Sequence, residues 1–272
     1  MTTELQPSKN VTAALALAVM FYGTLLVGIE ITSRLNEELS PVHSSPLSFL
    51  VIISVSLVFI AATGLSRGWS SLRLDRGKRL RELLRSSTLA FGLFLGYLVV
   101  VILPIVGFVY AYGGSLRVDW LRAPTSLAGL VAGLLSALFV YSYVIRSLLQ
   151  QLRGLRGILI ASFTALPLNA ILWGTAWHLD QPMALIFIAS SILPTTILLV
   201  HLVLKLKNSF TSALTFALIN WRFYWIGFRI PPGQYEPYID AAVTGIASYL
   251  LLTLTLLLTR TQKKPAPDKP TT

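Results

Sequence analysis

The chain has 272 residues, of which 54% are apolar and 12% are charged, and its mean hydropathy is +0.71. A soluble domain carries about 25% charged residues, so this composition excludes a disordered chain and most soluble enzymes. The net charge is +11, an excess of basic over acidic residues. Such an excess is typical of nucleic-acid-binding proteins and of the cytoplasmic loops of membrane proteins. The absence of cysteine excludes disulfides, thiolate metal sites and a cysteine nucleophile.

Long uncharged stretches predict membrane-spanning helices. Seven are long enough to cross a hydrocarbon core of about 30 Å, and in chain order they cover residues 10–29, 39–66, 86–116, 123–145, 157–179, 181–204 and 241–259. The stretch 208–221 is shorter, and we expect it to continue as a helix past Arg222 into Phe-Tyr-Trp-Ile-Gly-Phe. Within lipid, only a helix satisfies all backbone groups inside one segment. The sequence therefore predicts an all-α, polytopic integral membrane protein with eight transmembrane helices, the first of them retained rather than cleaved as a signal peptide.

The basic residues lie mostly in alternate connections between these stretches. Seventeen of the 22 fall on one side, with the largest group in residues 67–85, while most acids fall on the other side. Cytoplasmic loops carry such an excess of Lys and Arg. We therefore expect both termini to be cytoplasmic, with the lipid bilayer as a partner and no nucleic acid.

We expect one transmembrane domain over residues 1–272. Its N-terminal helices cover about 11–135 and a second group covers about 136–259, followed by a disordered cytoplasmic tail over 260–272. Pro104, Pro167 and Pro194 lie inside predicted spans and should bend them. The small residues of Gly92-x-x-x-Gly96 and Gly129-x-x-x-Gly133 favour close approach of another helix.

Few side chains could carry chemistry. The three histidines are His43, His178 and His201, and their spacing matches no His-x-x-x-His or His-Glu-x-x-His motif. A conventional zinc site is therefore not predicted.

The segment Ala170-Ile-Leu-Trp-Gly-Thr-Ala-Trp-His178-Leu-Asp-Gln-Pro182 resembles the second motif of the CPBP family, the CAAX-type and bacteriocin-processing intramembrane proteases. The first motif of that family, Glu-Glu-x-x-x-Arg, would correspond to Tyr141-Ser142-Tyr-Val-Ile-Arg146. Its third motif, His-x-x-x-Asn, would correspond to Phe216-Ala-Leu-Ile-Asn220. The resemblance covers roughly residues 141–220 and makes 136–259 a CPBP-like core.

This resemblance implies a site formed by His178, Asn220 and Arg146, with Tyr141 and Ser142 at the positions of the two glutamates. In the family, a glutamate would activate water as general base, while His and Asn would position water or a metal and stabilise the oxyanion. Tyrosine is a poor base at neutral pH, and serine needs an activating partner of its own. The resemblance therefore implies a degenerate, non-catalytic member that binds peptide or lipidated segments or acts as a scaffold. It implies no cofactor, although a divalent metal near His178 stays open.

Alternatives remain at this stage. The chain could be an active intramembrane endopeptidase with a diverged site, a transporter, or a subunit of a membrane complex. Glu30 or Asp180 could supply a carboxylate to His178, although each is better explained as an interfacial or loop acid. Tyr141 and His178 are expected at different depths, so a shared site requires a tilted or broken helix, with Val144–Leu155 lying in the interface.

Overall fold

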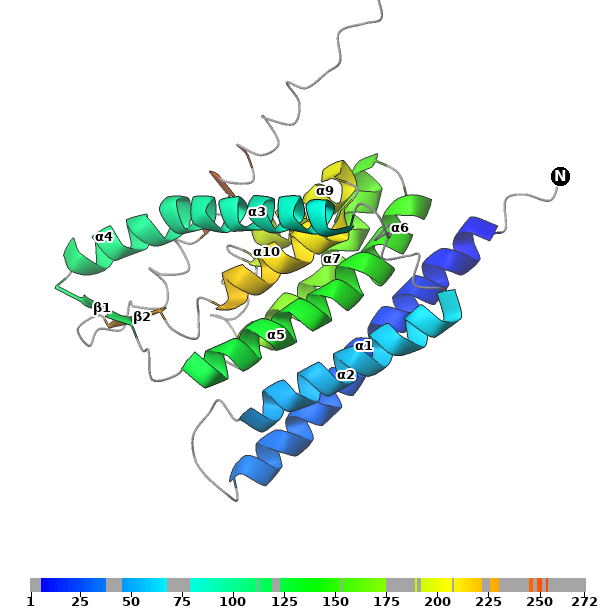
Figure 1. The fold of residues 1–272 in the computed structure, drawn as a ribbon, viewed down its shortest axis with the longest axis horizontal. Coiled ribbons are helices and arrows are strands. Elements are labelled where there is room, and N and C mark those ends of the chain that lie inside the picture. Colours follow the sequence, from blue (N-terminus) through cyan, green and yellow to red (C-terminus); the bar gives the residue numbers. More distant parts are fainter. Residues whose placement is uncertain are drawn as a thin grey trace, which may run out of the picture.

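The computed structural model describes most of the chain as helices (Figure 1). The residues it describes are 6–37, 46–67, 79–111, 113–118, 123–152, 154–174, 189, 192–206, 208–221, 226–229, 245–246, 249–250 and 253. The α-helices are α1 Gln6–Glu37, α2 Pro46–Arg67, α3 Arg79–Tyr97, α4 Leu103–Ala111, α5 Ala123–Phe139, α6 Arg146–Gln151, α7 Gly154–Gly174, α9 Leu193–Leu206 and α10 Ser209–Trp221. Two π-helical segments, η2 Leu98–Ile102 and η4 Val140–Ile145, join α3 to α4 and α5 to α6.

Four of the helical spans are long and apolar enough to cross a membrane. Within the described residues these are Val11–Arg34, Arg81–Val100, Leu127–Gln151 and Gly154–Leu172. Two shorter apolar helices cover Ser48–Gly64 and Leu193–Leu206. Several such helices in one chain are typical of an integral, multi-pass membrane protein. The expected total of eight stays a prediction, because most of 181–191 and 241–259 lies outside the described residues.

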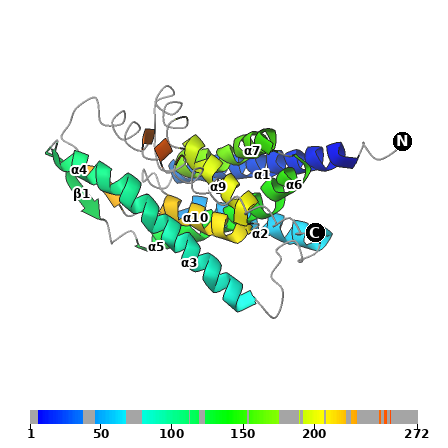
Figure 2. The ribbon, with the colours of Figure 1, turned by 90° about the horizontal axis from the view of Figure 1, so that it is seen from above.

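The helices α1, α2 and α5 run side by side, and α3 crosses the bundle obliquely (Figure 1). Figure 2 shows α10 between α3 on one side and α7 and α9 on the other, and α10 packs against α3, α5 and α9. Aromatic rings fill the space between α1, α2 and α5. The rings of Phe21 and Phe139 lie 4.5 Å apart, and both contact Phe59.

Two short strands add a feature that the sequence analysis did not predict. Strand β1 (Ser115–Val118) pairs antiparallel with β2 (Ile226–Arg229), with Ser115 opposite Arg229 and Val118 opposite Ile226. The prediction that the helix after residue 208 continues past Arg222 is therefore wrong over residues 226–229. In this two-stranded ladder each strand bonds to the other along one edge, so residues 226–229 find backbone partners across the ladder and not within a helix.

The prolines have different effects from one helix to the next. Pro104 follows the π-helical segment η2, in which the N–H of Leu103 bonds to the carbonyl of Leu98. This local register accommodates a residue that lacks an N–H and whose ring crowds the preceding turn. Pro167 lies inside α7, which continues to Gly174. Pro194 is the second residue of α9 and follows closely on Ile192, which is π-helical.

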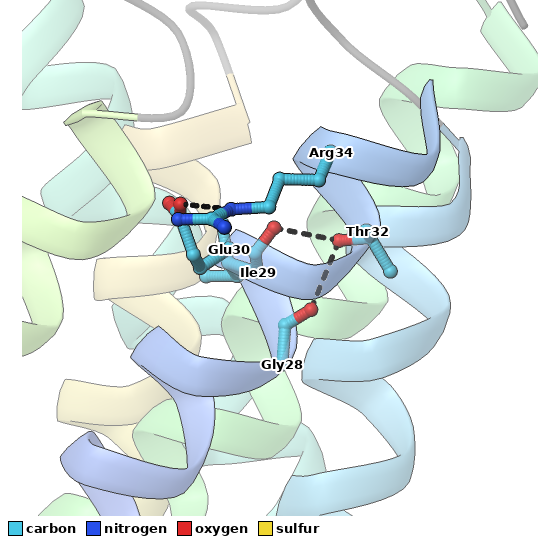
Figure 3. Close-up of polar contacts among 5 residues, drawn as sticks. All are labelled: Gly28, Ile29, Glu30, Thr32 and Arg34. Atoms are coloured by element: carbon cyan, nitrogen blue, oxygen red, sulfur yellow. Dashed lines mark hydrogen bonds and ion pairs between the residues drawn. The ribbon is translucent and has the colours of Figure 1, made fainter. Parts of the chain in front are cut away.

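The helix pair α1–α2 packs closely at Gly28. A Cβ at this position would lie 2.5 Å from Val51 Cγ1, whereas a Cβ at Gly23 on the same helix would meet nothing within 4 Å. Thr32, one turn after Gly28, donates its hydroxyl to backbone carbonyls of its own helix (Figure 3). Its hydroxyl oxygen lies 3.5 Å from that of Ser48 on α2. Gly28 is therefore the contact point that sets the distance between the two helices.

We predict that Gly28→Ala lowers the stability of the protein by about 1–3 kcal/mol, because the β-branched side chain of Val51 cannot move aside freely. Thermal unfolding of the purified protein in detergent measures this loss. Gly23→Ala is the matched control and should leave the midpoint unchanged or slightly raised. Adding Val51→Ala to Gly28→Ala should restore most of the loss, and a failure of this rescue would contradict the assigned contact.

Candidate functional site

The π-helical segment η4 is a buried polar part of the membrane-spanning bundle. All six of its residues are buried, and it contacts α1, α7, α9 and α10 as well as the helices on either side. Three consecutive residues, Tyr141, Ser142 and Tyr143, bring hydroxyl groups into this mainly apolar span. Polar groups are costly in hydrocarbon, and π-helical turns are frequent at functional sites. We therefore take η4 as the centre of the candidate site.

Tyr141 lies at the centre of this region and is fully buried. Its ring centroid is 5.9 Å from that of Phe216 on α10, with the two rings tilted by 58°. Its hydroxyl has no hydrogen-bond partner within the described part of the chain. Nearby, the hydroxyl of Tyr22 on α1 donates to the carbonyl of Thr164 on α7 over 2.8 Å. Tyr141 is thus held by aromatic packing, with its phenol group inside the bundle.

Ser142 connects η4 to the beginning of α10. Its hydroxyl shares a hydrogen bond with that of Ser209, with 2.8 Å between the oxygens. At a second level of the same helix pair, a Cβ at Gly133 would lie 3.6 Å from the Cα of Ala217. These two contacts fix an antiparallel register, in which α10 begins opposite Ser142 and runs back along α5. The expectation that Gly133 permits close helix approach is confirmed, whereas Gly92 and Gly96 face nothing within 4 Å.

The turn between α9 and α10 adds further polar contacts. The side-chain oxygen of Asn208 accepts a hydrogen bond from the backbone N–H of Phe210 over 2.9 Å, which caps the start of α10. The side-chain amide of Asn208 donates to the hydroxyl of Ser86 on α3. Hydrogen bonds therefore link α3, α10 and η4 in sequence through Ser86, Asn208, Ser209 and Ser142.

Asn220 lies apart from Ser142. It is buried, and its side-chain amide donates to the carbonyl of Phe216 over 2.9 Å. It follows Ser209 by eleven residues of one helix, which corresponds to about 16 Å along the axis. The structure therefore brings Tyr141 to Phe216 and Ser142 to Ser209, and it does not bring Asn220 to Ser142.

Arg146 follows η4 as the first residue of α6. It is half-buried and interacts with another residue of the protein. The chain stays helical through Gln151, and Val144, Ile145 and Leu148 are buried in the core. The segment after Val144 therefore continues the span instead of lying separately in the interface, which differs from the expectation for Val144–Leu155.

Three sequence-based candidates lie outside the described residues. These are His178, which the resemblance places in the site, the neighbouring Asp180, and His43. The open possibility of a metal near His178 lies outside them as well. Among the residues that the structure does describe, no three side chains of His, Cys, Asp or Glu come together.

Glu30, the other acid considered as a carboxylate for the site, forms an ion pair on the surface of α1. Its Oε1 lies 2.8 Å from Nε of Arg34, and both side chains are exposed (Figure 3). The pair belongs to one helix at spacing i, i+4, so it connects no other element. Glu30 therefore takes no part in the buried region around η4.

Hydroxyl and amide groups dominate the site chemically. A second buried link of this kind joins α7 to α9, where the side-chain amide of Asn169 donates to the hydroxyl of Thr196 over 2.7 Å. Such groups can hold and orient a polar ligand, but none is a base at neutral pH. The sequence analysis missed Ser86, Asn208, Ser209 and Asn169. The pair Asn208-Ser209 before an apolar run is an N-cap pattern and could have indicated where α10 begins.

No protein-family model, curated protein or solved structure matches this chain. The resemblance to the CPBP family therefore rests on the motif residues alone.

The contact between Ser142 and Ser209 can be tested by a disulfide, because the natural chain has no cysteine. We predict that the double variant Ser142→Cys, Ser209→Cys forms an intramolecular disulfide on mild oxidation in membranes, since the two hydroxyl oxygens are 2.8 Å apart. Peptide mass spectrometry detects the cross-link.

The matched control pairs Ser136→Cys with Ser209→Cys. Ser136 is buried on α5, bonds to the carbonyl of Ala132 on its own helix, and lies six residues before Ser142. This offset is about 9 Å along the helix and prevents a disulfide. Equal cross-linking of both pairs would contradict the assigned register.

Proposed function

We propose that this chain is a non-hydrolytic, CPBP-like multi-pass membrane protein that binds a lipidated or apolar peptide segment within its bundle. The contact between Tyr141 and Phe216 carries this proposal. The resemblance assigns these two positions to a catalytic glutamate and to the histidine of the third motif, which must lie close together in an active protease. Their ring centroids are 5.9 Å apart, although the residues are far apart in the sequence.

The identities of these two residues argue against hydrolysis. A phenol is neutral at physiological pH, and a phenyl ring can neither take up a proton nor bind a metal. Loss of a general base alone lowers a rate by about 10²–10⁴-fold, and loss of several residues that act together lowers it further. Both rings are fully buried, and under the resemblance they would occupy the position where a protease activates water.

Binding of a membrane-embedded segment remains compatible with such a site. The bundle holds buried hydroxyl and amide groups on η4, α7, α9 and α10, next to large apolar side chains, and a bound segment would exchange its own hydrogen bonds with the pairs that these groups form. An apolar peptide or lipid-modified segment would need both kinds of contact, because its backbone groups require partners in a low-dielectric environment.

The proposal predicts saturable binding without cleavage. Purified protein in lipid nanodiscs would be incubated with a farnesylated peptide that carries a photoreactive group. We expect cross-linking that unlabelled peptide displaces and no cleavage product by mass spectrometry. Phe216→Leu should weaken binding several-fold by altering the packing around Tyr141. Phe163→Leu is the control, because Phe163 is exposed on α7.

Two results would overturn the proposal in different ways. Cleavage of the peptide that is lost in His178→Ala would identify an active protease with a diverged site. A specific binding site around Phe216 would be excluded if the cross-linking does not saturate. It would also be excluded if Phe216→Leu and Phe163→Leu change the cross-linking by the same amount.

We also infer that both termini face the cytoplasm, as the distribution of basic residues predicts. The pairing of β1 with β2 agrees with the alternation of the connections, since it joins two segments that the charge pattern assigns to one side of the membrane. Single cysteines at Thr3 and Thr271 should react with an impermeant maleimide only after the cells are opened, whereas a cysteine at Ser115 should react in intact cells. The reverse pattern would contradict this orientation.

A further inference from the structure

The junction between α3 and the turn after α9 carries an inference that does not depend on the proposed peptide binding. The hydrogen bond from Asn208 to Ser86 holds this turn against α3. Arg85 directly precedes Ser86, and Lys205 lies three residues before Asn208. The bond therefore holds the turn after α9, which follows Lys205, against the part of α3 that carries Arg85.

Both basic side chains are available to a ligand. Arg85 and Lys205 are exposed, and neither forms an ion pair with an acid among the described residues. Arg81, one turn earlier on α3, is exposed as well. Glu82 is the one acid on α3, and α9 and α10 contain none, so the junction has a positive charge.

The start of α10 adds to this positive potential. The N-terminus of a helix favours negative charge, because its first N–H groups and its dipole point outward. At this terminus the N–H of Phe210 already bonds to the side chain of Asn208, so the end of α10 contributes its dipole and no free donor of that residue.

The position of the charges relates the junction to the surface of a membrane. Arg85 is the last charged residue before the uncharged stretch 86–116, and Lys205 is the first after 181–204. Exposed leucines on the same two helices lie beside them, namely Leu84, Leu204 and Leu206. Charges at the ends of apolar spans lie at the level of lipid headgroups, with apolar side chains next to the acyl chains.

We propose that this junction binds the phosphate of an anionic phospholipid, with Arg85 and Lys205 as its cationic contacts. A free phosphate would match the charges but would gain nothing from the leucines. An anionic phospholipid matches both the basic side chains, through its phosphate, and the exposed leucines, through its acyl chains.

Native mass spectrometry of the full chain in detergent tests this proposal by titration with phosphatidylglycerol, phosphatidylcholine and inorganic phosphate. We expect the wild-type protein to prefer phosphatidylglycerol. Arg85→Gln combined with Lys205→Gln should weaken that binding about 25-fold, because each basic residue near a membrane surface contributes about fivefold. Glu82→Gln should strengthen it several-fold, since it removes the one nearby acid.

Arg156→Gln is the matched control. Arg156 is exposed at the start of α7, is assigned by the charge pattern to the same side of the membrane, and should change the affinity less than twofold. Equal affinity for phosphatidylcholine, or an equal effect of Arg156→Gln and the double variant, would overturn the site. Inorganic phosphate binding as tightly as phosphatidylglycerol would show a free-anion site and overturn the assignment to lipid. None of these outcomes bears on peptide binding at Phe216.

Discussion

The close antiparallel packing of α5 and η4 against α10 is the constraint on which the rest of the bundle depends. In lipid, apolar surfaces gain little from leaving their solvent, so helices associate through close packing and hydrogen bonds. Both occur on this pair. Gly133 lets the backbone of α10 approach at Ala217, and the hydroxyl pair of Ser142 and Ser209 fixes the other end. This register brings Phe216 to Tyr141 and places the start of α10 where α3 can reach it.

The two π-helical segments have different causes. Segment η2 directly precedes Pro104, and a wider turn relieves the crowding that a proline imposes on the preceding residues. Segment η4 contains no proline, and all of its residues are buried. It carries the hydroxyls that the bundle must satisfy, one of which reaches across to α10. The wider turn at η2 thus has a structural cause, which is the nearby proline. The one at η4 coincides with buried polar side chains, and only this second turn marks the candidate site.

Sequence patterns predicted the membrane class and one helix contact. The predicted helix ends were wrong where a charged residue was taken as the end of the helix. Uncharged stretches mark the apolar part of a span, but a helix continues wherever its backbone remains bonded. For this reason α1 extends to Glu37, and the helix that contains Tyr141 continues past Arg146 to Gln151. The spacing of Gly129 and Gly133 predicted close approach of another helix because small residues act locally, and at Gly133 that helix is α10. The pairing of Ser142 with Ser209 has no local signal, since it depends on how two distant helices align.

The length of α10 explains why the polar groups gather where they do. Its 13 residues cover about 20 Å, less than a hydrocarbon core of about 30 Å. At its far end, the ladder of β1 and β2 provides backbone partners where the helix has stopped. At its near end, the first N–H groups lie opposite Ser142, close to the boundary of the apolar stretch, and cannot face acyl chains without partners. Asn208 caps them, and Ser86 of α3 binds Asn208. A short helix thus requires a polar turn at the membrane boundary, and that turn holds the chain after α9 against α3 at Ser86.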